Sequence, residues 1–308
     1  MKIQRINFQG YNRMKINRNV QLLLLVLPAF IATFIFAYIP MYGVTIAFKD
    51  FSFKAGIMSS PWVGFKHFIR FFQYPDLFTM IKNTLRLSLY SLAMFPLNVI
   101  LALLLNELKN AKFKKTVQMV SYAPHFISTV VLCGMIHLFL ARGNGLFNNF
   151  MAYIGSERVD FLSKPDNFAH IYVWSGVWQG IGWGSIIYLA ALAGVSPELI
   201  DSARIDGANR VQVIEHINIP CIMPTIVIMF ILNSGYIMNI GFEKILLLQN
   251  DLNRTASRVI QTYVYQIGVL GGDFSYTAAI GLFNNIINII ILLIVNKTAR
   301  ELAGVGIW

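Results

Sequence analysis

Six long stretches without a charged side chain constrain this chain more than any other feature. Cutting the 308-residue sequence at every Asp, Glu, Lys and Arg leaves six runs of roughly 18 residues or more. A membrane-spanning helix needs about 20 mostly apolar residues, and hydrocarbon requires every backbone polar group to be paired internally. We therefore expect six transmembrane helices, within residues 19–48, 87–106, 116–141, 167–197, 216–242 and 274–296.

The composition supports a polytopic, all-α membrane protein. Hydrophobic residues make up 56% of the chain and charged residues only 13%, whereas a soluble domain carries about 25% charged residues. This balance excludes an ordinary cytosolic enzyme and a disordered chain. Cys133 and Cys221 both lie in apolar runs, so they indicate neither a disulfide framework nor a metal cluster.

The first apolar run is interpreted as an uncleaved span rather than a signal peptide. It exceeds the usual h-region of about 7–15 residues, and no small-x-small cleavage site follows it. With the N-terminus inside, 13 of the 25 Lys and Arg residues are cytoplasmic. The totals are nearly equal on the two sides, but the short cytoplasmic segments are denser in basic residues, above all 109–115.

This orientation defines the expected domain organisation. Residues 1–19 form a cytoplasmic N-terminal tail, residues 20–296 the six-helix transmembrane domain, and residues 297–308 a cytoplasmic C-terminal tail. The outer loops carry 12 basic residues against 8 acidic ones. This excess mildly favours an anionic cargo or partner, although lipid contacts explain it equally well.

Motifs for catalysis or for cofactor binding are missing from the sequence. There is no G-x-x-x-x-G-K-[ST], so we expect no ATP bound through a P-loop, and there is no H-E-x-x-H or G-x-S-x-G. The five histidines are too scattered to suggest a metal site. The spans hold no charged residue, which argues against an ion-coupled carrier using a buried carboxylate but not against sodium held by backbone carbonyls.

One predicted cytoplasmic loop, residues 196–220, has a residue pattern that indicates a helix, a glycine bend and a second helix. Ser196 suits a helix N-cap, Pro197 the first helical position, and Gly207 a bend. A second amphipathic helix follows, and Pro220 then suits the start of the fifth span. A solvated connector is the simpler alternative, but the small residues beside acidic and basic ones favour a surface that docks on a partner.

The loop resembles the EAA loop of the permease subunits of bacterial ABC importers, patterned E-A-A-x-x-x-G-x(9)-I-x-L-P. Asp201-Ser202-Ala203, Gly207, Ile217 and Ile219-Pro220 stand at that spacing, and 206–208 has the D-G-A form common in sugar importers. Asp201, Ser202 and Ile219 depart from the family's Glu, Ala and Leu. Segments 40–50, 60–65, 83–85, 122–131 and 241–247 resemble permeases for complex oligosaccharides, related to the maltose permease.

The resemblance implies a transport subunit that is not itself an enzyme and binds no cofactor; ATP and Mg belong to a partner ATPase. It implies a heterodimer with a second homologous permease, two ATPase subunits and an extracytoplasmic solute-binding protein. It places the chain as a multi-pass protein in the bacterial cytoplasmic membrane, among lipid, importing an oligosaccharide by alternating access, with no nucleic-acid partner. The residues expected to couple it to the ATPase are Glu198, Asp201, Ser202, Ala203, Asp206, Gly207, Ala208, Ile217 and Pro220.

The substrate path is expected to need amides and aromatic faces that stack on sugar rings. The candidates are Trp178, Trp183, Asn233, Tyr236 and Asn239, with Trp183, Asn233 and Tyr236 closest to the maltose permease pattern. Packing or interface anchoring is the alternative for Trp174 and Trp178, which are spaced i and i+4. A permease for another solute, an ATP-independent carrier and an intramembrane transferase remain the rival functions.

Overall fold

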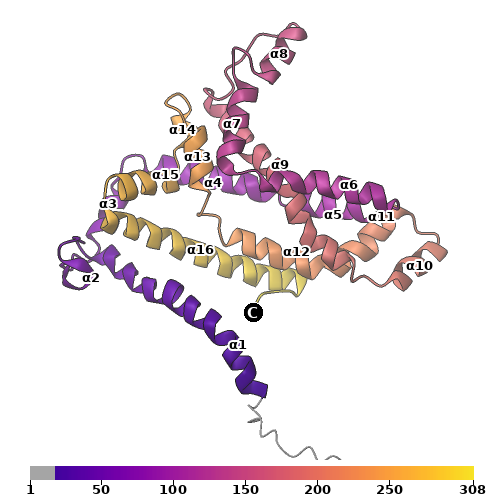
Figure 1. The fold of residues 1–308 in the computed structure, drawn as a ribbon, viewed down its shortest axis with the longest axis horizontal. Coiled ribbons are helices and arrows are strands. Elements are labelled where there is room, and N and C mark those ends of the chain that lie inside the picture. The colour runs from indigo at the N-terminus through magenta and orange to yellow at the C-terminus, as the bar shows by residue number, and fades with distance from the viewer. Residues whose placement is uncertain (1–17) are drawn as a thin grey trace, which may run out of the picture.

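The computed structural model describes residues 18–308, and helices and their connections make up that range (Figure 1). Within it, the isolated β-bridge is the antiparallel pair Lys49 and Trp62. The α-helices are α1 (Arg18–Thr33), α2 (Gly56–Ser59), α3 (Lys66–Phe72), α4 (Leu77–Ala93), α5 (Pro96–Asn106), α6 (Ala111–Tyr122), α7 (Thr129–Leu140), α8 (Leu146–Tyr153), α9 (Pro165–Leu192), α10 (Pro197–Ile205), α11 (Arg210–Val213), α12 (Ile219–Ser234), α13 (Phe242–Leu248), α14 (Arg254–Ser257), α15 (Ile260–Val264) and α16 (Phe274–Ala303). Two segments are 3-10 helices, η2 (Ile39–Phe48) and η3 (Ala123–Phe126). Three are π-helices, η1 (Phe34–Tyr38), η4 (Ile214–Asn218) and η5 (Tyr265–Leu270).

All six charge-free runs overlap with helical segments. Four of these segments are helices long and apolar enough to cross a membrane, and two are bent helix pairs that reach that length when each pair is counted as one span. Four are continuous: Val20–Phe48, Leu77–Asn106, Arg210–Ser234 and Phe274–Ala303. The other two belong to bent helix pairs, Ala111–Phe126 with Thr129–Leu140 and Pro165–Leu192 with Pro197–Ile205. The expectation of an all-α, polytopic membrane fold is confirmed.

The third run is not one straight helix. The axis turns by 98° between η3 and α7. Pro124 lacks a backbone donor, and extended Ser128 accepts a hydrogen bond from the Val131 amide and thereby starts a new helix. The flanking α6 and α7 have 12 residues each, or about 18 Å, which is short of the roughly 30 Å hydrocarbon layer.

The fifth span also differs from its expected limits. The second helix of the predicted loop and the span form one helix, because α11 and α12 are joined without a break by the π-helical turn η4. A π turn accommodates the irregular hydrogen bonding next to Pro220, which lacks an N–H. The helix ends at Ser234, eight residues before the charge-free run ends at Phe242.

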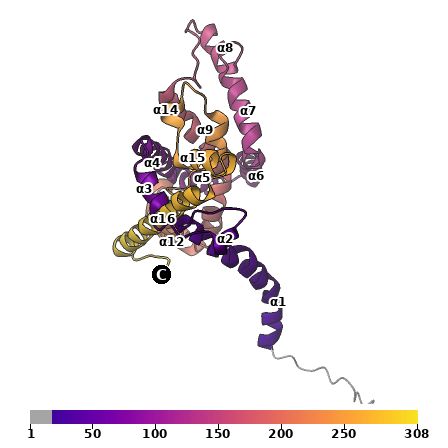
Figure 2. The same cartoon turned by 90° about the vertical axis from the view of Figure 1, so that its left-hand side faces the viewer.

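Helix α9 lies at the centre of the bundle, in contact with α4, α5, α6 and α12 (Figures 1 and 2). Two of its glycines permit the closest approaches. A Cβ on Gly182 would lie 2.0 Å from the Ser121 carbonyl oxygen of α6, and one on Gly184 would lie 2.8 Å from the Asn98 side chain of α5. Small residues at such crossings let helices approach closely where lipid gives no hydrophobic drive for their association.

Helix α1 stands away from this bundle in both views (Figures 1 and 2). From Val20 onward its side chains are exposed on every face of the helix; Leu25 and Phe36, in α1 and η1, are both 80% exposed. The chain rejoins the bundle only at η2, which packs against α16 and α3. An apolar helix this long therefore needs lipid or another subunit to cover it.

Candidate functional site

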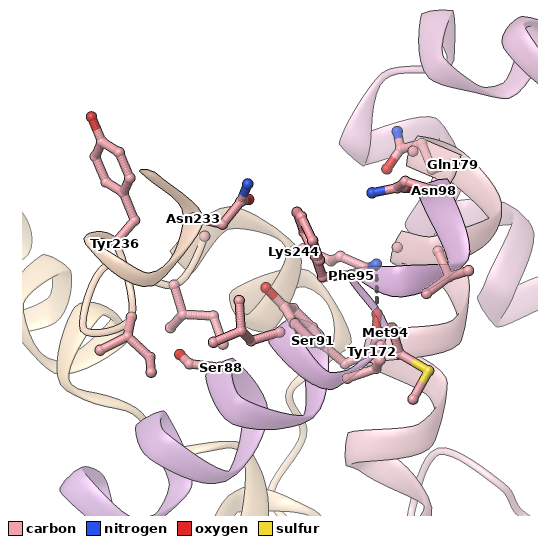
Figure 3. A pocket seen from close by; sticks show the side chains of 18 of the residues that line it. Ser88, Ser91, Met94, Phe95, Asn98, Tyr172, Gln179, Asn233, Tyr236 and Lys244 are labelled. Carbon is pink, nitrogen blue, oxygen red and sulfur yellow. Dashed lines mark hydrogen bonds between the residues drawn. The ribbon is translucent and has the colours of Figure 1, made fainter. Parts of the chain in front are cut away.

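A cavity of about 470 Å³ opens between α4, α5, α9 and the segment that follows α12 (Figure 3). Its volume falls in the usual range of small-molecule sites, about 300–1,000 Å³. Hydroxyl and amide side chains supply much of its polar lining, and the rings of Phe95, Tyr172 and Tyr236 supply aromatic surface. Apart from the two tyrosines, the uncharged polar side chains are Ser88, Ser91, Asn98, Gln179, Asn233 and Asn239.

Three of the residues predicted for the substrate path line this cavity. Asn233 is in the last turn of α12, and Tyr236 and Asn239 follow the helix end at Ser234. On a continuous helix, Asn233 and Asn239 would be about 120° apart. The early end of α12 removes that separation, so the two amides face one space. Tyr236 is 69% exposed, and its side chain points away from the other labelled side chains (Figure 3).

The two predicted tryptophans of α9 are not among the cavity-lining residues. Trp183 stacks on His125, with ring centroids 4.4 Å apart and planes 4° from parallel. Trp178 is 46% exposed. Trp174, for which packing was the alternative, donates to the hydroxyl of Tyr90 at 3.0 Å. A role for Trp178 and Trp183 in the substrate path stays a prediction from sequence.

Lys244 is a cavity residue that the sequence reasoning missed, because the search for spans treated every lysine as a boundary. It lies in α13, outside the membrane-spanning helices, and only 9% of it is exposed. Its Nζ donates to the Tyr172 carbonyl at 2.8 Å and lies 4.8 Å from the centre of the Tyr172 ring (Figure 3). Burial lowers the pKa of the ammonium to about 8, so it remains protonated at neutral pH. A lysine directly before Ile-Leu-Leu-Leu was the signal available.

The predicted coupling loop has the local geometry that its residues indicated. The hydroxyl of Ser196 accepts a hydrogen bond from the Glu198 amide, and Pro197 begins α10. Gly207 has a φ of 86°, which few other residues adopt, and ends the helix. These expectations are confirmed. The sequence analysis missed that Asn209 and Gln212 form a capping box that starts α11.

A groove of about 320 Å³ follows the bend of this loop. Five of the nine predicted coupling residues border it, together with Gln212 and His216. The remaining four are not part of the groove lining. Helix α10 also exposes apolar side chains, with Leu199 exposed by 52% and Ile205 by 86%. The predicted residues at the groove are Ala203, Asp206, Gly207, Ala208 and Ile217, and those elsewhere are Glu198, Asp201, Ser202 and Pro220.

Apolar spans around a polar cavity, with a protruding, capped helix between two of them, define a membrane transport subunit. The family model described as the binding-protein-dependent transport system inner membrane component matches residues 98–300, and the chain belongs to this family. It is therefore a permease subunit of ABC importers, in which ATP is hydrolysed by a separate ATPase subunit.

Similar proteins cover nearly the whole chain. The polygalacturonan/rhamnogalacturonan transport system permease protein YteP of Bacillus subtilis (strain 168) is 40% identical over 295 residues, which is 96% of this chain and 92% of YteP. Protein LplB of the same organism is 40% identical over 294 residues, 95% of this chain and 92% of LplB. A chain in the crystal structure of a bacterial alginate ABC transporter, in complex with an alginate pentasaccharide-bound periplasmic protein, matches with 38% identity and a TM-score of 0.85. That match covers 94% of this chain and 97% of the other.

Proposed function

We propose that this permease imports an acidic oligosaccharide across the bacterial cytoplasmic membrane by alternating access. The observation that carries the proposal is the cavity, where amides, aromatic faces and the ammonium of Lys244 converge. Aromatic faces suit sugar rings and amides suit hydroxyl groups. The names of the relatives support an acidic sugar, since polygalacturonan and alginate both appear among them.

The proposed complex contains a second homologous permease, two ATPase subunits and an extracytoplasmic solute-binding protein. The exposed arm of α1 and η1 supports a heterodimer, because a partner helix would cover its apolar surface. In this arrangement the second permease closes the cavity on its open side. The periplasmic protein bound in the alginate transporter structure supports delivery of the sugar from outside.

The topology proposed for the chain has both termini in the cytoplasm and residues 20–296 as the transmembrane domain. Basic residues crowd the short segment 109–115 that joins the second and third spans. On the same side, α10 enters a cleft of the ATPase subunit, and ATP and Mg are bound by that subunit rather than by this chain. Gly207 sets the bend, and the carboxylate of Asp201, 68% exposed, accepts hydrogen bonds from a basic or amide group of the ATPase.

Coupling is tested by replacing Gly207 with valine in the complete importer, reconstituted in proteoliposomes. A β-branched residue at a φ of 86° is strained and must reshape the loop. We expect sugar uptake and ligand-stimulated ATP hydrolysis to be lost while the permease still inserts. Gly304→Val is the matched control, because Gly304 has a φ of 65°, has open space around it and lies outside the coupling loop. Unchanged uptake by the Gly207 variant would refute the coupling role.

The substrate class is tested by uptake of radiolabelled trigalacturonate and of a neutral trisaccharide by the same proteoliposomes. We expect ATP-dependent uptake of the acidic sugar. If only the neutral sugar is taken up, the proposed acidic substrate is wrong, and the alternative of a permease of this family for another solute remains.

A further inference from the structure

The charge of Lys244 has no partner within the described part of the chain. No carboxylate among residues 20–308 forms an ion pair with its ammonium, although the side chain is 91% buried. An ammonium has three N–H donors, and one of them is used, by the Tyr172 carbonyl. Buried charges in proteins are normally paired, because desolvation disfavours an isolated charge. An anion that pairs with this ammonium would therefore come from outside this range of the chain.

The surroundings of the ammonium leave room for that anion on the cavity side. Lys244 and Gly176 both line the cavity, and a Cβ on Gly176 would lie 3.4 Å from Nζ. Because Gly176 has no side chain, α9 does not cover the ammonium on the side that faces the cavity. Neutral amides of Asn239 and Gln179 share the same space. They can bond sugar hydroxyl groups but cannot neutralise a charge.

A purely structural role fits the side chain less well. The bond to the Tyr172 carbonyl needs only a neutral N–H donor, which a glutamine supplies without the cost of burying a charge. The Tyr172 ring, 4.8 Å away, gives a cation–π contact, which stabilises the cation but does not neutralise its charge. Neither contact supplies a counter-charge for the ammonium.

We propose that Lys244 is the anion subsite of the cavity and that its ammonium binds a carboxylate of the passing uronic acid sugar. This inference rests on the proposed import of an acidic oligosaccharide. A single charge-assisted bond favours sugars that carry a carboxylate while still allowing release, since transport requires binding that is weak enough to leave.

The test compares variants of the complete importer in proteoliposomes, with radiolabelled trigalacturonate below saturation. Lys244→Gln should lower its uptake by about 10- to 100-fold, as expected for loss of one hydrogen bond to a charged group. Lys244→Arg should keep uptake within about threefold of the unaltered importer, since arginine is always protonated and bonds carboxylates well. Lys82→Gln is the matched control, because it removes one exposed lysine that does not line the cavity.

Two further readouts separate substrate binding from packing. The melting temperature of Lys244→Gln should equal or exceed that of the unaltered importer. In detergent, without binding protein, trigalacturonate should raise the melting temperature of the unaltered importer more than its methyl ester does. This last measurement does not depend on any variant folding.

The outcomes distinguish the subsite from the substrate class. If the unaltered importer takes up no trigalacturonate, both the proposed substrate and the subsite are wrong. If it takes up the sugar and Lys244→Gln does so equally well, the subsite alone is wrong. Equal melting shifts with the acid and its ester, or loss of uptake in the arginine variant together with the glutamine variant, also overturn the subsite.

Discussion

The contact between α9 and α6 at Gly182 gives a sharp prediction for stability. An alanine Cβ there would lie 2.0 Å from the Ser121 carbonyl oxygen, 2.4 Å from its carbonyl carbon and 2.9 Å from the Tyr122 nitrogen. Ordinary contact begins at 3.4 Å, so the helices would have to separate locally by about 1.4 Å. All three atoms belong to the backbone of α6, which cannot rotate away as a side chain can.

The magnitude follows from two opposing effects. Replacing glycine by alanine within a helix is worth about 1 kcal/mol in favour of alanine. Overpacking a tight contact costs about 1–3 kcal/mol, occasionally more. Gly180→Ala is the matched control, because it lies two residues away in α9 and its Cβ would meet nothing within 4 Å. We expect Gly182→Ala to be less stable than Gly180→Ala by about 1–3 kcal/mol.

The assay is thermal unfolding of the purified importer in detergent, followed by the fluorescence of a thiol-reactive dye or by loss of the monodisperse peak. Gly180→Ala should melt at or above the temperature of the unaltered protein, and Gly182→Ala several degrees below it. If the melting temperature of Gly182→Ala equals or exceeds that of Gly180→Ala, the close approach of α6 to α9 does not require a glycine at position 182.

Two other contacts give predictions of the same kind. Asn83 donates hydrogen bonds to the carbonyls of Thr255 and Arg258 at 2.9 and 3.0 Å. Asn83→Ala leaves both carbonyls without that donor and should destabilise the importer by about 1–3 kcal/mol. Thermal unfolding measures this loss, and an unchanged melting temperature would contradict the prediction. Lys66, bonded to Asp50 at 2.6 Å, holds the pKa of that carboxyl below its ordinary value. A lowered carboxyl pKa stabilises the fold above the ordinary value and ceases to do so as the pH falls through the lowered one. The small difference in melting temperature between the unaltered protein and Lys66→Ala should therefore be present at pH 6 and shrink as the pH falls through the lowered pKa of Asp50, below its ordinary value of 3.8. A difference that stays the same between pH 6 and about pH 2 would contradict this reasoning.

The sequence alone determined the helical class and the approximate places of the spans. Hydrocarbon offers backbone groups no water, so an uncharged apolar run of this length must be helical, whatever it packs against. The turn chemistry of the loop was equally local. Ser196 bonds an amide two residues away, and Gly207 adopts its positive φ because it lacks a Cβ. Such features depend on neighbours along the chain and can be predicted from them.

The tertiary structure alone decided which polar groups share the cavity. Asn233 and Asn239 face one space because α12 ends at Ser234, although the apolar run continues beyond that residue. Lys244 became a cavity residue because α13 packs against α7 and places the ammonium on Tyr172, 72 residues earlier in the chain. Trp183 stacks on His125 and does not line the cavity, which is again a contact between segments far apart in the sequence. These positions depend on contacts between distant helices, and apolar periodicity does not specify which helices meet.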